Sequence, residues 1–194
     1  KSTVMAWLII WFLFCHYDAQ IGATAPTSEQ LHDVLWKEVK AWMDKMPAEL
    51  AGLFEWQSGY IRVRERAETW FARARTARKE APEAIAGLHG EWVMIIGDES
   101  SGIPDEIFRS AEGSMTGPNV LVLLIGKGTR NEGYFYDTHH DDKDNWQRFS
   151  FSSEDSPIVE EGYIERMAAK HGRESDEFKI RVKGGFPSTE SMDD

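Results

Sequence analysis

Trp92-Val93-Met94-Ile95-Ile96-Gly97-Asp98-Glu99 is the stretch that decides the fold of this chain. The apolar run from Trp92 to Ile96 has the length and composition of a central strand that is buried on both faces, as parallel sheets require. Two adjacent carboxylates, Asp98 and Glu99, close the run. Because burying a carboxylate costs several kcal/mol unless it is paired or holds a metal, carboxylates in this place indicate a functional site.

Helices and strands alternate along the rest of the chain. Apolar residues at helical spacing predict helices, and short apolar or β-branched runs predict strands. We expect helices over 2–17, 27–46, 82–87, from 104 onward and over 158–171, a helical turn after 175, and strands over 20–25, 54–64, 69–74, 92–96, 119–125 and near 149–151. This alternation predicts an α/β fold with a mostly parallel sheet.

Three segments that are distant in sequence are expected on one surface. Ligands of open α/β sheets bind at the carboxyl ends of the strands. Asp98 and Glu99 follow one strand, and the loop Gly126-Lys127-Gly128-Thr129-Arg130 follows another. Lys1 precedes the first helix, whose N-terminus faces the same edge of the sheet. The sequence therefore predicts that these segments form one site.

The composition describes one globular domain from a reducing compartment. The chain has 194 residues, of which 41% are hydrophobic, so it can bury a core. The single cysteine, Cys15, excludes an internal disulfide framework and fits the cytosol. A net charge of -11 excludes a protein that coats nucleic acid through its overall charge, but it leaves room for a local basic patch.

Residues 4–14 form an uninterrupted apolar run that allows two interpretations. One is a signal peptide, with small residues over 22–25 as its cleavage region. The other is a buried helix that follows a phosphate-binding loop and packs on a parallel sheet. The run is too short to cross a bilayer as a helix, which needs roughly 20 apolar residues, so we expect no membrane partner.

Several stretches together resemble the ATPase domain of the large terminase subunit, the motor that packages DNA into tailed phages. Lys1-Ser2-Thr3 is similar to the end of a Gly-x-x-x-x-Gly-Lys-Ser/Thr loop, and Asp98-Glu99 after an apolar strand is similar to a Walker B site. The ordered set also includes residues 25–27 with Gln30, 82–89, 98–103, 126–130, 133–137, 172–176 and 181–187. The resemblance implies an ASCE, RecA-like P-loop NTPase fold, which is a three-layer sandwich around a mostly parallel sheet.

The same resemblance implies the roles of individual residues and the cofactors ATP and Mg²⁺. Lys1 would reach the β- and γ-phosphates, and Ser2 and Thr3 would complete the nucleotide-binding loop, with the Ser2 hydroxyl on Mg²⁺. Asp98 would support the metal site. Glu99 would be the catalytic residue that activates water, and Thr129 would lie in the motif that couples hydrolysis to DNA movement.

Two departures from the family pattern bear on activity. The glycine half of the phosphate-binding loop is absent, so we expect a partial ATPase domain over 1–187 that begins at the loop lysine and binds ATP poorly. Lys127 stands where the family has an asparagine whose amide senses phosphate. We expect a flexible end over 188–194, and neither a nuclease domain nor nuclease activity.

As a terminase fragment, the chain would work in the host cytoplasm with double-stranded DNA, a portal protein and a small terminase subunit, within a homo-oligomeric ring. Two alternatives stay open. Another ASCE ATPase, such as a helicase-like DNA translocase, would share the Walker B site. A secreted, non-enzymatic binding domain with residues 1–25 as its signal peptide would not depend on Glu99.

Three smaller features also have two interpretations. Asp98-Glu99 could cap a helix instead of holding a metal. The basic residues between 62 and 79 could be a solvated surface, a DNA-backbone contact or the source of an arginine presented to a neighbouring subunit's ATP. The stretch His139-His140-Asp141-Asp142 could bind a metal, but a polar loop is its ordinary explanation.

Overall fold

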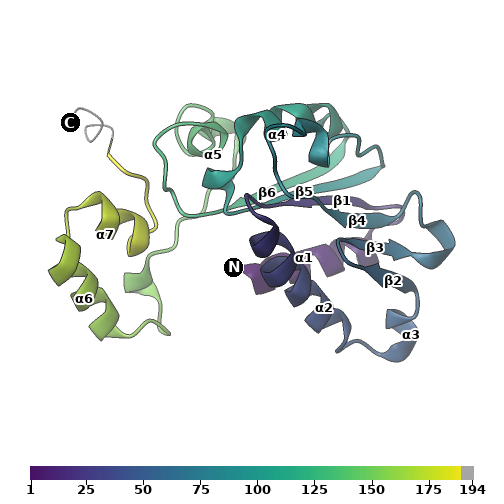
Figure 1. Cartoon of the computed structure of the whole chain (residues 1–194), viewed down its shortest axis with the longest axis horizontal. Coiled ribbons are helices and arrows are strands. Elements are labelled where there is room, and N and C mark those ends of the chain that lie inside the picture. The colour runs from purple at the N-terminus through teal and green to yellow at the C-terminus, as the bar shows by residue number, and fades with distance from the viewer. Residues whose placement is uncertain (189–194) are drawn as a thin grey trace. The chain divides into compact units, whose positions relative to one another are not determined.

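The structure is a computed structural model that describes residues 1–188 (Figure 1). The chain divides into two compact units, the first over Lys1–Ile125 and the second beginning at Gly126. The single ATPase domain over 1–187 stays a prediction, and the predicted flexible end lies outside the described residues except for Ser188.

A six-stranded sheet with the order β2-β3-β4-β1-β5-β6 forms the centre of the first unit. Four strands are parallel, namely β1 (Gln20–Thr24), β4 (Phe71–Ala74), β5 (Trp92–Asp98) and β6 (Asn119–Ile125). An antiparallel hairpin of β2 (Phe54–Gln57) and β3 (Tyr60–Val63) extends the sheet beside β4. The prediction of one strand over 54–64 is therefore wrong, because the chain reverses at Gly59, whose φ of +83° suits glycine.

One face of the sheet is covered by α1 (Ser2–Cys15), η1 (Glu29–Trp36) and α2 (Lys37–Met43). The turns of η1 are π-helical and run directly into α2. Met5, Ile9 and Leu13 recur every fourth residue along α1 and are fully buried. Burial of each such side chain stabilises the fold by about 1.5–3 kcal/mol. The apolar run that resembled a signal peptide is thus part of the core.

The opposite face carries η3 (Pro82–Ile85), η4 (Ser100–Gly102), α4 (Asp105–Ala111) and η5 (Glu112–Met115). Figure 1 shows α4 on the side of the sheet away from α1 and α2. Gly22 lets this layer approach β1, because a Cβ there would lie 3.0 Å from Leu88. A short helix, α3 (Ala48–Ala51), joins α2 to β2, and η2 (Arg64–Arg66) joins β3 to β4. The predicted three-layer α/β fold with a mostly parallel sheet is confirmed.

The second unit is made of short helices and loops within the described residues. They are α5 (Tyr134–Asp137), η6 (Lys143–Asn145), η7 (Ser153–Asp155), α6 (Glu161–His171) and α7 (Asp176–Arg181). Ser175 caps α7 by accepting the Phe178 N–H at 3.2 Å, and the Phe178 side chain is buried. The strand predicted near 149–151 is wrong, because Phe149 and Phe151 lie in an unpaired segment and are 65% and 82% exposed.

No helix in the described part of the chain combines the length and the apolar content that a bilayer crossing requires.

Candidate functional site

The carboxyl end of β5 is shaped by a tight reversal of the chain. The Ser100 hydroxyl donates to the Gly97 carbonyl at 2.9 Å and holds the start of η4 against the strand. A Cβ on Gly97 would lie 2.8 Å from that hydroxyl oxygen, so only glycine fits this close approach. The reversal places Asp98, the last residue of β5, and the following Glu99 at the carboxyl edge of the sheet.

Glu99 has a left-handed backbone, with φ of 49° and ψ of 48°. A non-glycine residue in this region carries strain of about 1–3 kcal/mol, and such strain concentrates at functional sites. Two hydrogen bonds hold this conformation: the Gly102 N–H donates to the Glu99 carbonyl at 2.8 Å, and the Glu99 N–H donates to Asp98 Oδ1 at 2.9 Å. The Glu99 side chain forms no capping bond to η4, so the structure does not favour the helix-cap interpretation.

Asp98 is a buried carboxyl group, with 4% of its surface exposed. Burial raises its pKa, and the charge of Glu99 adds to the rise. The charge of Lys1 and the Glu99 N–H act in the opposite direction. The fold thus holds the Asp98 carboxyl group in a place where its ionisation is unfavourable. A cation bound beside it would favour the ionised form and lower its pKa.

Lys1 meets Glu99 across 98 positions of sequence, and its ammonium group donates to Glu99 Oε1. The contact places the N-terminus of α1 at the carboxyl end of β5. The sequence had indicated that these two segments share one edge of the sheet, and the structure brings them into direct contact. Both side chains keep access to solvent, with 40% of Lys1 and 31% of Glu99 exposed.

The two hydroxyl residues after Lys1 have different surroundings. Ser2 is the first residue of α1, a position where backbone N–H groups are free to bind anions. The Thr3 hydroxyl instead donates to Glu38 of α2 at 2.8 Å, and Glu38 also accepts from the Trp42 indole at 3.0 Å. Thr3 therefore joins α1 to α2 in this structure, and its nucleotide-binding role stays a prediction.

Thr129 belongs to the second unit and is exposed there. Its N–H donates to the Lys127 carbonyl at 2.8 Å, which bends the loop. Gly128 packs so tightly under the C-terminal segment that a Cβ would lie 2.6 Å from the Phe186 ring and 2.7 Å from the Gly185 carbonyl oxygen. The loop is held in place by residues 185–186, and the coupling role of Thr129 stays a prediction.

The predicted metal ligands Asp98 and Ser2 are of a chemistry that suits a magnesium ion. Residues 1–188 contain no group of three or more histidine, cysteine or acidic side chains that could hold a metal by itself. Magnesium in nucleotide sites needs only one or two carboxylates, with water and phosphate oxygens as its other ligands. The buried Asp98 carboxylate and the Ser2 hydroxyl are oxygen donors of this kind.

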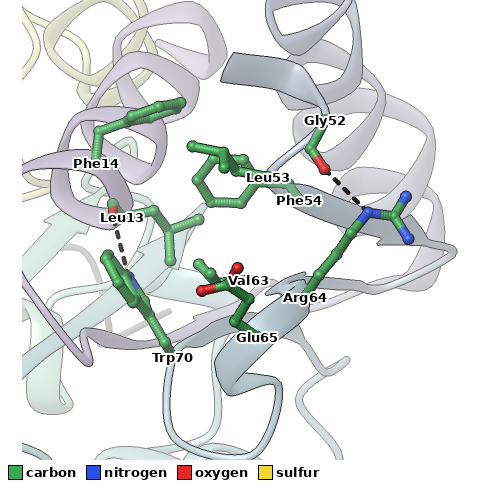
Figure 2. Close-up of a pocket in the computed structure, with 9 residues that line it drawn as sticks. All are labelled: Leu13, Phe14, Gly52, Leu53, Phe54, Val63, Arg64, Glu65 and Trp70. Atoms are coloured by element: carbon green, nitrogen blue, oxygen red, sulfur yellow. Dashed lines mark hydrogen bonds between the residues drawn. The ribbon is translucent and has the colours of Figure 1, made fainter. Parts of the chain in front are cut away.

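A pocket of about 290 Å³ in the first unit lies elsewhere. Figure 2 shows Leu13, Phe14, Phe54 and Val63 among its lining residues, with Arg64 and Glu65 beside them. Leu13 is 12 residues from Lys1, which is about 18 Å along a helix. The pocket therefore lies at the opposite end of α1 from Asp98 and Glu99 and is not part of their site.

One buried polar group near this edge escaped the sequence analysis. Thr24, which ends β1 and pairs in register with Gly97, is fully buried, and its hydroxyl has no hydrogen-bond partner in the described structure. A second feature is the contact of Gly102 with Pro26, where a Cβ would lie 2.8 Å from the proline ring. The sequence alone does not indicate the buried hydroxyl of Thr24 or the approach of Gly102 to Pro26. Both features arise because β1 and β5 are neighbours in the sheet.

No family model matches the chain. A search of curated proteins finds similarity to a probable large terminase subunit of Enterobacteria phage P7, with 29% identity over 206 residues, covering 98% of this chain and 41% of that protein. The chain thus spans about two fifths of the length of this relative.

Two solved structures have the same fold. The large terminase of a thermophilic bacteriophage, in complex with ADP, matches with a TM-score of 0.71 and 13% identity, over 96% of this chain and 46% of that chain. The large terminase ATPase domain of Thermus phage P74-26 matches with a TM-score of 0.65 and 15% identity, over 96% of this chain and 84% of that chain. These likenesses confirm the predicted fold class.

Proposed function

We propose that this chain, which is similar to a probable large terminase subunit of a phage, contains the ATP-hydrolysing site of a DNA-packaging motor. The sequence similarity to a probable large terminase subunit supports the proposal. The whole motor would drive double-stranded DNA through a portal protein into a procapsid in the host cytoplasm. It would work as a ring of copies, assisted by a small terminase subunit.

The observation that carries the proposal is the meeting of Lys1 and Glu99 at the carboxyl end of β5. A lysine at a helix N-terminus is a phosphate-binding arrangement, because the helix dipole and free N–H groups also attract anions. A carboxylate beside that place can polarise a water molecule that attacks the γ-phosphate. Two groups needed for phosphoryl transfer are therefore in contact, although 98 positions separate them.

Each residue then has a distinct task. Lys1 neutralises phosphate charge, and Glu99 orients and deprotonates the attacking water. The Asp98 carboxylate and the Ser2 hydroxyl would hold Mg²⁺, which supplies charge neutralisation on the phosphate oxygens when it is bound. The backbone of Glu99 is held in its left-handed conformation by its hydrogen bonds to Gly102 and to the Asp98 carboxylate.

Lys1 and Glu99 cannot do these tasks while they are bonded to each other. Nucleotide binding must therefore replace one ion pair by another, with Lys1 moving from Glu99 to a phosphate. The exchange frees the Glu99 carboxylate at the moment when a phosphate arrives. Because both side chains are partly exposed, breaking the resting pair costs little, at most about 1 kcal/mol.

The test is a titration of a fluorescent ATP analogue with Mg²⁺ into the chain and into a version with a Gly-x-x-x-x-Gly segment placed before Lys1. We expect the extended version to bind the analogue, because the segment supplies backbone N–H groups for the phosphates. In the extended version, Glu99→Gln should bind up to about fivefold more tightly because Lys1 is released. Lys1→Ala should lose binding.

The matched control is Glu106→Gln, which makes the same charge change at an exposed position on α4. It should bind like the unaltered protein. Equal affinities for the extended versions with and without Lys1→Ala would contradict the assignment of Lys1. A helicase-like translocase would give the same binding results, but the terminase relative favours the packaging motor.

A further inference from the structure

The structure separates the basic residues between 62 and 79 into paired and unpaired cations. Arg62 is held by Glu55, with its Nε and Nη2 each 3.0 Å from a carboxylate oxygen. Arg66 forms a similar bidentate pair with Asp18, in which Nε and Nη2 each donate to one carboxylate oxygen. A different group follows at the end of β4 and forms no salt bridge within residues 1–188: Arg73, Arg75, Arg78 and Lys79.

Arg73 is half-buried without an anionic partner. Its Nη2 donates to the Ala86 carbonyl, but its Nε is buried and has no hydrogen-bond acceptor in the described structure. Burial lowers the pKa of Arg73, and the like charge of Arg75 lowers it further. A buried donor of a charged group that lacks an acceptor is costly. An anion bound beside Arg75 would reduce the repulsion between the two guanidinium groups.

Arg75 lies on the same side of the sheet as Arg73. The ladder between β4 and β1 continues past Ala74, because the Arg75 N–H donates to the Ala23 carbonyl at 3.0 Å. Side chains two residues apart on an extended segment point to the same face. Arg75 is exposed. The two side chains therefore point to the same face of the sheet, and Arg78 and Lys79 follow within four residues of Arg75.

This cluster lies on the same edge of the sheet as the candidate ATPase site. β4 is parallel to β1, which is parallel to β5, so the carboxyl ends of all three strands face one way. Two strand spacings separate β4 from β5, or about 10 Å. A polymer bound along this edge would contact the cations while ATP occupies the neighbouring position at Lys1.

We propose that Arg73 and Arg75, with Arg78 and Lys79 beside them, bind phosphates of the double-stranded DNA backbone. The planar fork of arginine matches phosphate oxygens, and the exposed Arg75 presents this fork to solvent. Four cations within seven residues fit a run of phosphates better than a single nucleotide. The inference deepens the proposed function and rests on it for the identity of the polymer.

The test measures the affinity of the chain for a fluorescent DNA duplex, without ATP, over a series of salt concentrations. Arg75→Gln, at an exposed position, should weaken binding several-fold and reduce the salt slope by about 0.9, because one phosphate is no longer neutralised. Arg73→Gln should have a similar effect. Arg73→Lys should keep the slope but bind more weakly, because it keeps the charge and loses the fork.

The matched control is Arg64→Gln. Arg64 is exposed in the same basic segment, but it follows β3 near the start of β4, at the opposite edge of the sheet, and donates to the Gly52 carbonyl at 3.0 Å. Its removal should leave DNA affinity unchanged. Thermal unfolding of each variant checks that the fold is intact.

Two results would overturn the proposal. One is that the unaltered chain does not bind DNA at low salt. The other is that Arg75→Gln and Arg64→Gln weaken binding equally. ATP binding is measured separately on the same proteins. If the extended chain fails to bind ATP while Arg75→Gln still weakens DNA binding, that result would contradict the proposed ATPase function and support the DNA-binding site.

Discussion

Asp98→Asn should stabilise the resting protein while abolishing ATP hydrolysis. Asp98 is buried, and burial raises its pKa, so its ionised form is disfavoured in the fold. Asparagine has nearly the same shape, and its side-chain oxygen can still accept the Glu99 N–H that Asp98 now accepts at 2.9 Å. The substitution removes a buried charge and leaves the local hydrogen bond in place.

The gain depends on pH in a direction that the raised pKa fixes. A carboxyl group whose pKa is higher in the folded state binds protons more tightly there than in the unfolded chain. The free energy of unfolding of the unaltered protein therefore falls as the pH rises from about 3.9, the unfolded value, through the raised folded pKa. The fall amounts to about 1.4 kcal/mol for each tenfold difference in proton affinity between the two states. Above the folded pKa of Asp98, the free energy of unfolding does not fall further through this group.

At pH 7, the free energy of unfolding of Asp98→Asn should then exceed that of the unaltered protein by about 1–2 kcal/mol. Gains of this size are usual when a substitution removes an unfavourable feature of a functional site. The attraction between Lys1 and Asp98 reduces the gain, because asparagine loses it. The difference should shrink towards zero as the pH falls below about 4, where Asp98 becomes protonated in both states.

Urea denaturation from pH 4 to pH 8 measures this difference, without nucleotide or metal. Asp33→Asn, at an exposed position on η1, makes the same charge change and serves as the control. The reasoning is refuted if Asp98→Asn is the less stable protein at pH 7, or if its advantage does not change with pH.

Three further substitutions test the packing. Thr24→Val replaces a buried hydroxyl that has no partner, so urea denaturation should show a gain of about 1 kcal/mol, and a loss would mean that the hydroxyl is bonded. Gly128→Ala would push a Cβ to 2.6 Å from the Phe186 ring, so calorimetry should show a loss of about 1–3 kcal/mol, and an unchanged midpoint would contradict the packing. Ile9→Ala truncates a fully buried residue of α1 and should cost about 2–5 kcal/mol in urea denaturation, whereas a removable signal segment would give no change.

The parallel core could be predicted because its signals are local. The apolar runs over 92–96 and 119–125 have the composition of buried parallel strands, and they are β5 and β6 in the structure. The hairpin of β2 and β3 was missed because the signal for its turn is Gly59, a single glycine inside a run that otherwise has strand character. The strand expected near Phe149 and Phe151 failed because alternating aromatic residues need a neighbouring strand, and none lies beside them in the described structure.

The candidate site was predictable only in part. The expectation that Lys1 meets the end of β5 follows from the rule that parallel strands present their carboxyl ends at one edge, and the contact with Glu99 agrees with it. The bond from Thr3 to Glu38 depends on how two helices pack, which the sequence does not specify. The division of the arginines depends on partners such as Glu55 and Asp18, which pattern alone cannot place.

The most direct test of the central claim is ATP hydrolysis by the chain with a Gly-x-x-x-x-Gly segment placed before Lys1, with and without linear double-stranded DNA. The account predicts hydrolysis that DNA stimulates, a loss of roughly 10²- to 10⁴-fold in Glu99→Gln, and no loss in Glu106→Gln. Hydrolysis that survives in Glu99→Gln, or a folded protein that binds ATP and does not hydrolyse it, would contradict the account.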